Sequence, residues 1–157
     1  MQRRVALQVL LLSLAGSSLP AMKDRTWQTL LLAQKDLFPA IERFHIDTDT
    51  YMRYIFSHPK IKKSTKRFML QGAKELGSVA VKKFGKNYLE LTSRQRNLLL
   101  RDFTKSGTKK RWALVVMRYG VEACFSDPVY GTNRDGASWR WIGYTPGLPR
   151  PKVKDGP

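Results

Sequence analysis

Residues 108–124 read TKKRWALVVMRYGVEAC and contain the clearest periodicity in this 157-residue chain. Five of its apolar and aromatic residues stand at Trp112, Val115, Val116, Tyr119 and Ala123. This i, i+3, i+4, i+7, i+11 spacing places all five on one face of a helix. The segment therefore predicts a helix that begins near Thr108 and buries that face.

The segments before it show helical periods with clear ends. A first helix is expected after Asp24, and Pro39 should end it because proline lacks an amide donor and clashes with the preceding turn. Asp47 offers a cap for a short helix that His58 and Pro59 stop. A longer helix then runs to Gly85, which is expected at its C-cap.

Thr92 and Gln95 have the spacing of a capping box, which predicts the start of one more helix. No segment alternates as a strand would, and there is no internal repeat. The sequence therefore predicts an all-α fold, with a small helical bundle over residues 22–124.

The composition changes after Cys124. Residues 125–157 contain five glycines, five prolines and no helical period, so an irregular, extended and turn-rich C-terminal arm is expected. Aromatic residues also lie there, at Phe125, Tyr130, Trp139, Trp141 and Tyr144. Disordered tails are normally poor in aromatic residues. The arm is therefore expected to dock on a surface, either of its own bundle or of another chain.

Basic residues dominate the chain, with 29 Lys and Arg against 12 Asp and Glu, for a net charge of +17. Ten of them, with Glu75 as the one acid, lie between Arg53 and Lys86. One interpretation is an exported protein that binds polyanions through this Arg53–Lys86 cluster. The others are a solvated face, or steering toward an acidic partner subunit. No nucleic-acid motif is present, and no nucleic-acid partner is expected.

The chain has few of the residues that catalysis uses. One cysteine and two histidines exclude a disulfide framework within the chain, a zinc finger and a CxxCH haem attachment. The two glycine-rich phosphate-binding motifs are absent as well. We therefore expect no catalytic, cofactor-binding or metal-binding residues in this chain.

The amino terminus has the pattern of a bacterial export signal. Arg3 and Arg4 precede an apolar stretch about half as long as the ~20 residues that span a bilayer, and small residues follow up to Ala21. The paired arginines favour the twin-arginine route, which carries folded proteins. Residues 1–21 are thus the expected signal and the mature protein is expected in the periplasm. A retained amphiphilic anchor helix is the alternative.

The segment FSDPVYGTNRDGASWRWIGY, residues 125–144, resembles the signature of the gluconate 2-dehydrogenase subunit 3 family, approximately D-P-x-Y-G-G-N-x-D-G-x-G-W-x-x-I-G. The matching positions are Asp127, Pro128, Tyr130, Gly131, Asn133, Asp135, Gly136, Trp139, Ile142 and Gly143. Thr132 and Ser138 stand where the family usually has glycine. A looser resemblance extends upstream over most of the mature chain.

The resemblance implies a small, cofactor-free subunit of a membrane-associated bacterial dehydrogenase that oxidises sugars, sugar acids or polyols. Its partner would be a GMC-type flavoprotein large subunit that carries FAD, and a cytochrome c subunit with haem c often passes the electrons on. The small subunit of such complexes bears the export signal. We therefore expect a non-catalytic subunit that binds, stabilises and co-exports the flavoprotein, and that associates with the membrane through the complex.

The expected partner-binding residues lie in and beside the C-terminal motif. They are Cys124, Phe125, Asp127, Pro128, Tyr130, Gly131, Asn133, Asp135, Gly136, Trp139, Trp141, Ile142, Gly143 and Tyr144. Cys124 is expected either to form a disulfide with the partner subunit or to be buried as a small apolar residue.

Overall fold

The computed structural model describes residues 25–150 and 152, and all their regular elements are helices. The expected export signal, with Arg3 and Arg4, lies outside the described residues. The first described helix covers residues 25–37. It is followed by α2 (Ala40–Arg43), α3 (Thr48–Ser57), α4 (Lys63–Phe84), the 3₁₀ turn η1 (Tyr88–Glu90), α5 (Ser93–Phe103) and α6 (Gly107–Phe125). The all-α prediction is confirmed.

The helix ends follow from the capping residues of the sequence. Asp47 accepts the amide of Thr50 at 3.0 Å and so caps α3. Gly85 ends α4 in the left-handed conformation, with φ of 66°. In the capping box of α5, the Thr92 hydroxyl accepts the amide of Gln95 at 3.3 Å, and the Gln95 side chain accepts the amide of Thr92 at 3.0 Å.

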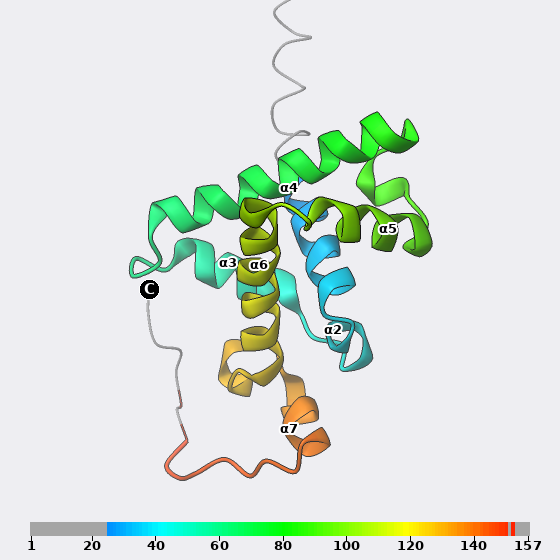
Figure 1. The fold of residues 1–157 in the computed structure, drawn as a ribbon. Helices are drawn as coiled ribbons and strands as arrows, with labels where there is room; N and C mark the ends of the chain where they lie inside the picture. Colours follow the sequence, from blue (N-terminus) through cyan, green and yellow to red (C-terminus); the bar gives the residue numbers. More distant parts are fainter. Residues whose placement is uncertain (1–24, 151, 153–157) are drawn as a thin grey trace, which may run out of the picture.

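Helix α6 runs through the middle of the bundle. In Figure 1, α4 lies across one end of α6, and α7 closes the other end. Four of the five residues of the predicted apolar face of α6 are buried, with Val116 and Ala123 fully enclosed, and Val115 is half-buried. The indole of Trp112 donates to the carbonyl of Met69 at 2.9 Å and packs against Gly72, which joins α6 to α4.

A buried polar network ties the first helix to the segments after α4. Arg96 donates to both carboxylate oxygens of Asp36, at 2.8 and 3.0 Å, and the hydroxyl of Tyr88 donates to the same carboxylate at 2.7 Å. The side chains of Arg96 and Asp36 are 15% and 10% exposed. Because little water reaches this pair, its two hydrogen bonds hold the elements more firmly than a surface ion pair would.

The C-terminal arm is turn-rich as expected but is not extended throughout. It contains two 3₁₀ turns, η2 (Pro128–Tyr130) and η3 (Arg134–Gly136), and then α7 (Ala137–Trp141). The sequence shows no period here because these elements are shorter than two helical turns. After Trp141 the chain forms no regular element up to residue 150. Within the described residues, no helix is long and apolar enough to cross a membrane.

Candidate functional site

The C-terminal motif folds over the end of α6. The last carbonyls of an α-helix have no hydrogen-bond donors within the helix. Here, side chains of the motif donate to them. Thr132 Oγ1 donates to the carbonyl of Ala123 at 3.0 Å, and Ser138 Oγ donates to that of Cys124. These are the two positions where the family signature usually has glycine. Neither has a positive φ, so both departures add a hydrogen bond and leave the backbone in an ordinary conformation.

Asn133 and Trp139 complete this cap. Trp139 Nε1 donates to the carbonyl of Phe125 at 3.0 Å, and Asn133 Nδ2 donates to that of Ser126 at 3.2 Å. Asn133 is fully buried and Trp139 is 8% exposed. Both residues were expected to bind a partner, but their polar atoms bond within the chain. The inner part of the arm therefore docks on its own bundle.

The turns of the arm depend on residues that the motif supplies. Gly131 and Gly136 have φ of 79° and 63°, in the left-handed region that favours glycine. Asp135 is also left-handed, with φ of 56°. Asp127 begins η2 and accepts the amide of Val129 at 3.0 Å. The motif thus specifies the backbone path of the arm.

Cys124 is fully buried beneath this cap. Burial raises the pKa of its thiol from 9.0 to about 12. The sulfur faces the inside of the molecule, so a bond to a partner subunit would require the arm to leave α6. Of the two alternatives for Cys124, this burial favours the small apolar residue over a disulfide with the partner subunit.

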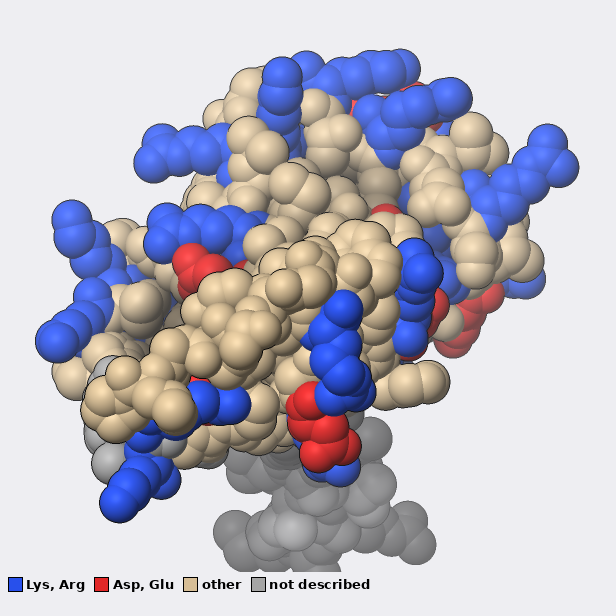
Figure 2. Space-filling model, turned by 90° about the horizontal axis from the view of Figure 1, so that it is seen from below, with Lys and Arg blue, Asp and Glu red and all other residues tan. Residues whose placement is uncertain are grey.

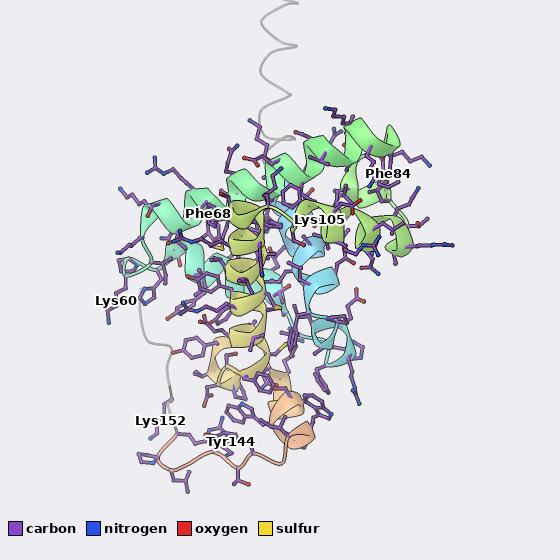
Figure 3. The ribbon with its side chains drawn as sticks, viewed as in Figure 1. Lys60, Phe68, Phe84, Lys105, Tyr144 and Lys152 are labelled. Carbon is purple, nitrogen blue, oxygen red and sulfur yellow. The ribbon has the colours of Figure 1, made fainter. Side chains whose placement is uncertain are left out.

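The outer part of the arm leaves large apolar side chains in solvent. Trp141, Ile142, Tyr144 and Leu148 are exposed. In Figure 3, Tyr144 lies at the far end of α6 from Phe68 and Phe84 of α4. The sequence prediction included the first three of the exposed residues but not Leu148, because a leucine between glycine and proline follows no periodic pattern.

An open groove of about 500 Å³ lies beside the arm, between α3, α6 and η2. The rings of Tyr54 and Tyr130 meet there at 5.2 Å, and the hydroxyl of Tyr51 donates to Glu122 at 3.3 Å. The other oxygen of Glu122 accepts Arg118 at 2.7 Å. Burial, with Glu122 nearby, raises the pKa of Tyr51 well above 10. Tyr51 is therefore a neutral hydrogen-bond donor and not a base at neutral pH.

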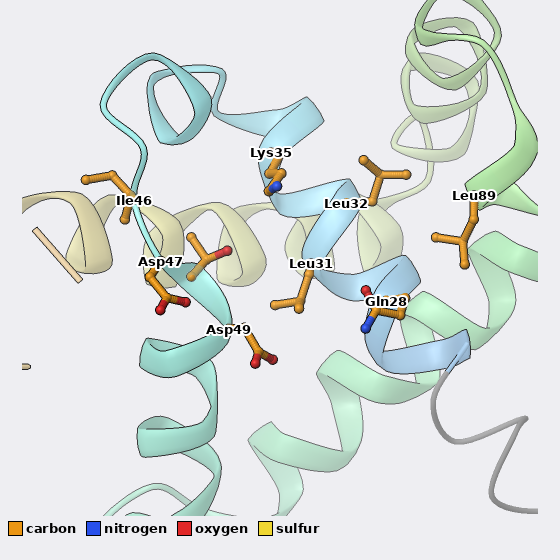
Figure 4. A pocket seen from close by; sticks show the side chains of 9 residues that line it. Gln28, Leu31, Leu32, Lys35, Ile46, Asp47, Asp49 and Leu89 are labelled. Atoms are coloured by element: carbon orange, nitrogen blue, oxygen red, sulfur yellow. The ribbon is translucent and has the colours of Figure 1, made fainter. Parts of the chain in front are cut away.

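A second pocket, of about 440 Å³, lies between the first helix and the start of α3 (Figure 4). Its carboxylates already have donors. Asp47 caps α3, and Asp49 accepts Trp27 Nε1 at 2.6 Å and Arg53 Nε at 2.8 Å. Within residues 25–150 and 152, no three or more His, Cys, Asp and Glu side chains are grouped to hold a metal ion.

The basic residues between Arg53 and Lys86 do not form one cluster. Arg67 and Lys82 stand near opposite ends of α4, roughly 22 Å apart along a helix with ~1.5 Å per residue. Lys83 is paired with Asp102 at 2.6 Å. The basic residues are thus spread along the whole of α4, which weakens the interpretation as a single polyanion-binding cluster.

Comparison with known families agrees with the resemblance of the C-terminal motif. The profile of the family described as Gluconate 2-dehydrogenase subunit 3 matches residues 28–147, from the first helix to the exposed part of the arm. Comparison with curated proteins and with solved structures gives no match.

Proposed function

Because the chain belongs to the gluconate 2-dehydrogenase subunit 3 family, we propose that it is the small, non-catalytic subunit of an FAD-dependent dehydrogenase acting on a sugar, sugar acid or polyol. Family membership makes it a subunit of a dehydrogenase complex. The finer proposal is that it binds and stabilises a GMC-type flavoprotein large subunit. FAD is bound by that subunit. In complexes of this kind a cytochrome c subunit with haem c often accepts the electrons.

The extent of the family match carries this proposal. It covers the bundle and the arm together, so both parts belong to the unit that defines the family. The chemistry of the motif residues supports a structural role. The carboxylate of Asp127 accepts a backbone amide and the guanidinium of Arg150. Such a carboxylate holds a turn and is poorly placed to move protons for a substrate.

Export is the second half of the proposal. Arg3 and Arg4, in the expected signal of residues 1–21, direct this chain to the twin-arginine route. FAD is inserted before export, so the flavoprotein has to cross the membrane folded, and it crosses bound to this chain. The complex then lies in the periplasm, where it associates with the membrane through its other subunits.

Co-expression with the flavoprotein from the same organism tests the proposal. We expect the two chains to elute as one complex that carries FAD and oxidises substrate. The small chain expressed alone is expected to be colourless and inactive, and the flavoprotein expressed alone to be less abundant. A small chain that is yellow with bound FAD when expressed alone would contradict the proposal. So would a flavoprotein whose yield and activity are the same without this chain.

A further inference from the structure

The outer part of the arm carries a concentration of exposed apolar side chains. Half of the large apolar side chains that are exposed in the described chain lie between residues 141 and 148. Trp141, Ile142 and Tyr144 are 53%, 52% and 52% exposed, and Leu148 is 87% exposed. Figure 2 looks at this end of the molecule and shows a broad strip of uncharged side chains, bordered mostly by Lys and Arg and in places by Asp and Glu. Apolar patches of this kind are typical of interaction sites.

The segment that carries these side chains is fixed at both ends. At its start, the amide of Tyr144 donates to the carbonyl of Trp139 at 2.9 Å, and their rings meet at 5.4 Å. At its end, Arg150 donates to both oxygens of Asp127, at 3.0 and 3.1 Å, and lies 4.9 Å over the ring of Trp139. Trp141, at the end of α7, and the residues up to 149 therefore form a segment, the loop 141–149, that is closed on the cap of α6. Its other large apolar side chains, Ile142 and Leu148, stay exposed.

Helix α2 supports the same surface. Phe44, which follows α2, meets the ring of Trp141 at 5.2 Å, and the guanidinium of Arg43 lies 5.5 Å over that ring. Trp141 is thus held by an aromatic and a cationic side chain while half of it faces solvent. Aromatic side chains that are already fixed by packing beside an arginine are typical of the centres of protein interfaces, because they lose little conformational freedom on binding.

We propose that the loop 141–149, with Arg43 and Phe44, is the surface through which this chain docks on the flavoprotein. The inference rests on the proposed function and assigns its contact surface. The matching surface on the flavoprotein is an apolar pocket with carboxylates at its rim. Charge supports this choice of partner: the exposed cations in and beside this surface, Arg43, Arg134, Arg140 and Lys152, outnumber the exposed acids Glu42 and Asp135. The whole chain carries +17.

Affinity for the purified flavoprotein, measured by calorimetry with full-length variants, tests the apolar part. We expect Trp141→Ser and Leu148→Ser each to raise Kd by about tenfold or more. Leu114→Ser on α6 is the matched control, since Leu114 is 52% exposed but lies outside the loop. It is expected to change Kd by less than about twofold. Each variant is also unfolded, and an unfolding curve that matches the curve of the wild type shows that its folding is intact.

Association rates test the charged part. Arg43→Glu and Arg67→Glu change the net charge equally, and both side chains are exposed. Arg43→Glu is expected to slow association more, because Arg67 lies on α4, away from the loop. If the loop variants bind like wild type, or Leu114→Ser and Arg67→Glu weaken binding as much, the docking surface is wrong while the proposed function stands. If the wild-type chain does not bind the flavoprotein, the proposed function itself is wrong.

Discussion

Gly72 allows α6 to pack directly on α4. A Cβ atom at this position would lie 2.2 Å from Cδ1 of Trp112, which is 1% exposed. Gly72→Ala therefore has to displace the indole, and we expect the free energy of unfolding to fall by about 1–3 kcal/mol or more. Gly77→Ala on the same helix is the control. Its Cβ meets nothing within 4 Å. Because alanine favours the helix over glycine, the free energy of unfolding should rise by up to about 1 kcal/mol.

Chemical denaturation of both variants makes this comparison. A Gly72→Ala protein as stable as the Gly77→Ala protein would show that α4 and α6 can separate without cost.

Cys124 should react slowly in the folded protein. Thiolate is the reactive form, and burial raises the pKa of this thiol to about 12. At pH 8 we expect an aromatic disulfide reagent to modify Cys124 at least about a hundredfold more slowly in buffer than in denaturant. Since the folded pKa exceeds the unfolded value, this thiol also stabilises the fold fully below pH 9 and loses that contribution as pH rises toward 12. Equal labelling rates in buffer and denaturant would contradict the buried position.

At the residue scale, the sequence predicted the positions that follow a period or a capping rule. The buried face of α6 and the capping box at Thr92 and Gln95 are examples. It could not predict the bonds of Asn133 and Ser138, because each reaches a backbone carbonyl many positions earlier in the chain. Every residue has a backbone carbonyl, so the residue types do not show which carbonyl will accept such a bond.

The arm acts as the C-terminal cap of α6, and Ser138 is central to it. Its hydroxyl contacts the carbonyl of Cys124 and lies 3.0 Å from the amide oxygen of Asn133. Ser138→Ala removes the donor to the buried carbonyl of Cys124. We therefore expect the free energy of unfolding to fall by about 1–3 kcal/mol. Ser78→Ala is the control, since the Ser78 hydroxyl contacts the carbonyl of Lys74 at an exposed site. It should change stability by less than about 0.5 kcal/mol.

Urea unfolding followed by circular dichroism measures both serine variants. Equal stability of the two would mean that the arm does not cap α6.

The cap also explains why removal of the arm is a poor test of docking. That deletion would leave the last carbonyls of α6 without these donors, so folding and binding would change together.

The network of Asp36, Tyr88 and Arg96 makes stability sensitive to high pH. Burial, and then the hydrogen bond to Asp36, raise the pKa of Tyr88 above its ordinary value of 10. The unfolded state therefore loses this proton first, and the free energy of unfolding should fall as pH rises above about 10. In Tyr88→Phe this fall should be shallower. Identical slopes for wild type and Tyr88→Phe would contradict the network.

At the scale of the whole molecule, the sequence predicted helices but not their arrangement. Caps and periods are local, whereas the pair of Asp36 and Arg96 joins residues 60 positions apart. The sequence predicts an arm that docks, and it leaves open whether the surface belongs to its own bundle or to another chain. The structure divides the arm: residues up to Trp139 cap α6, and the loop 141–149 faces solvent. Family membership then makes the chain one component of a larger dehydrogenase.

The periplasmic fraction of the flavoprotein tests the central claim most directly. It is measured in cells that express the flavoprotein with the wild-type chain, with an Arg3→Lys, Arg4→Lys double variant, or with no small chain. The double variant keeps the charge of the signal but removes the arginine pair. We predict that only the wild-type chain moves the flavoprotein and its FAD-dependent activity into the periplasm. Equal periplasmic amounts of flavoprotein in all three strains would contradict co-export by this subunit.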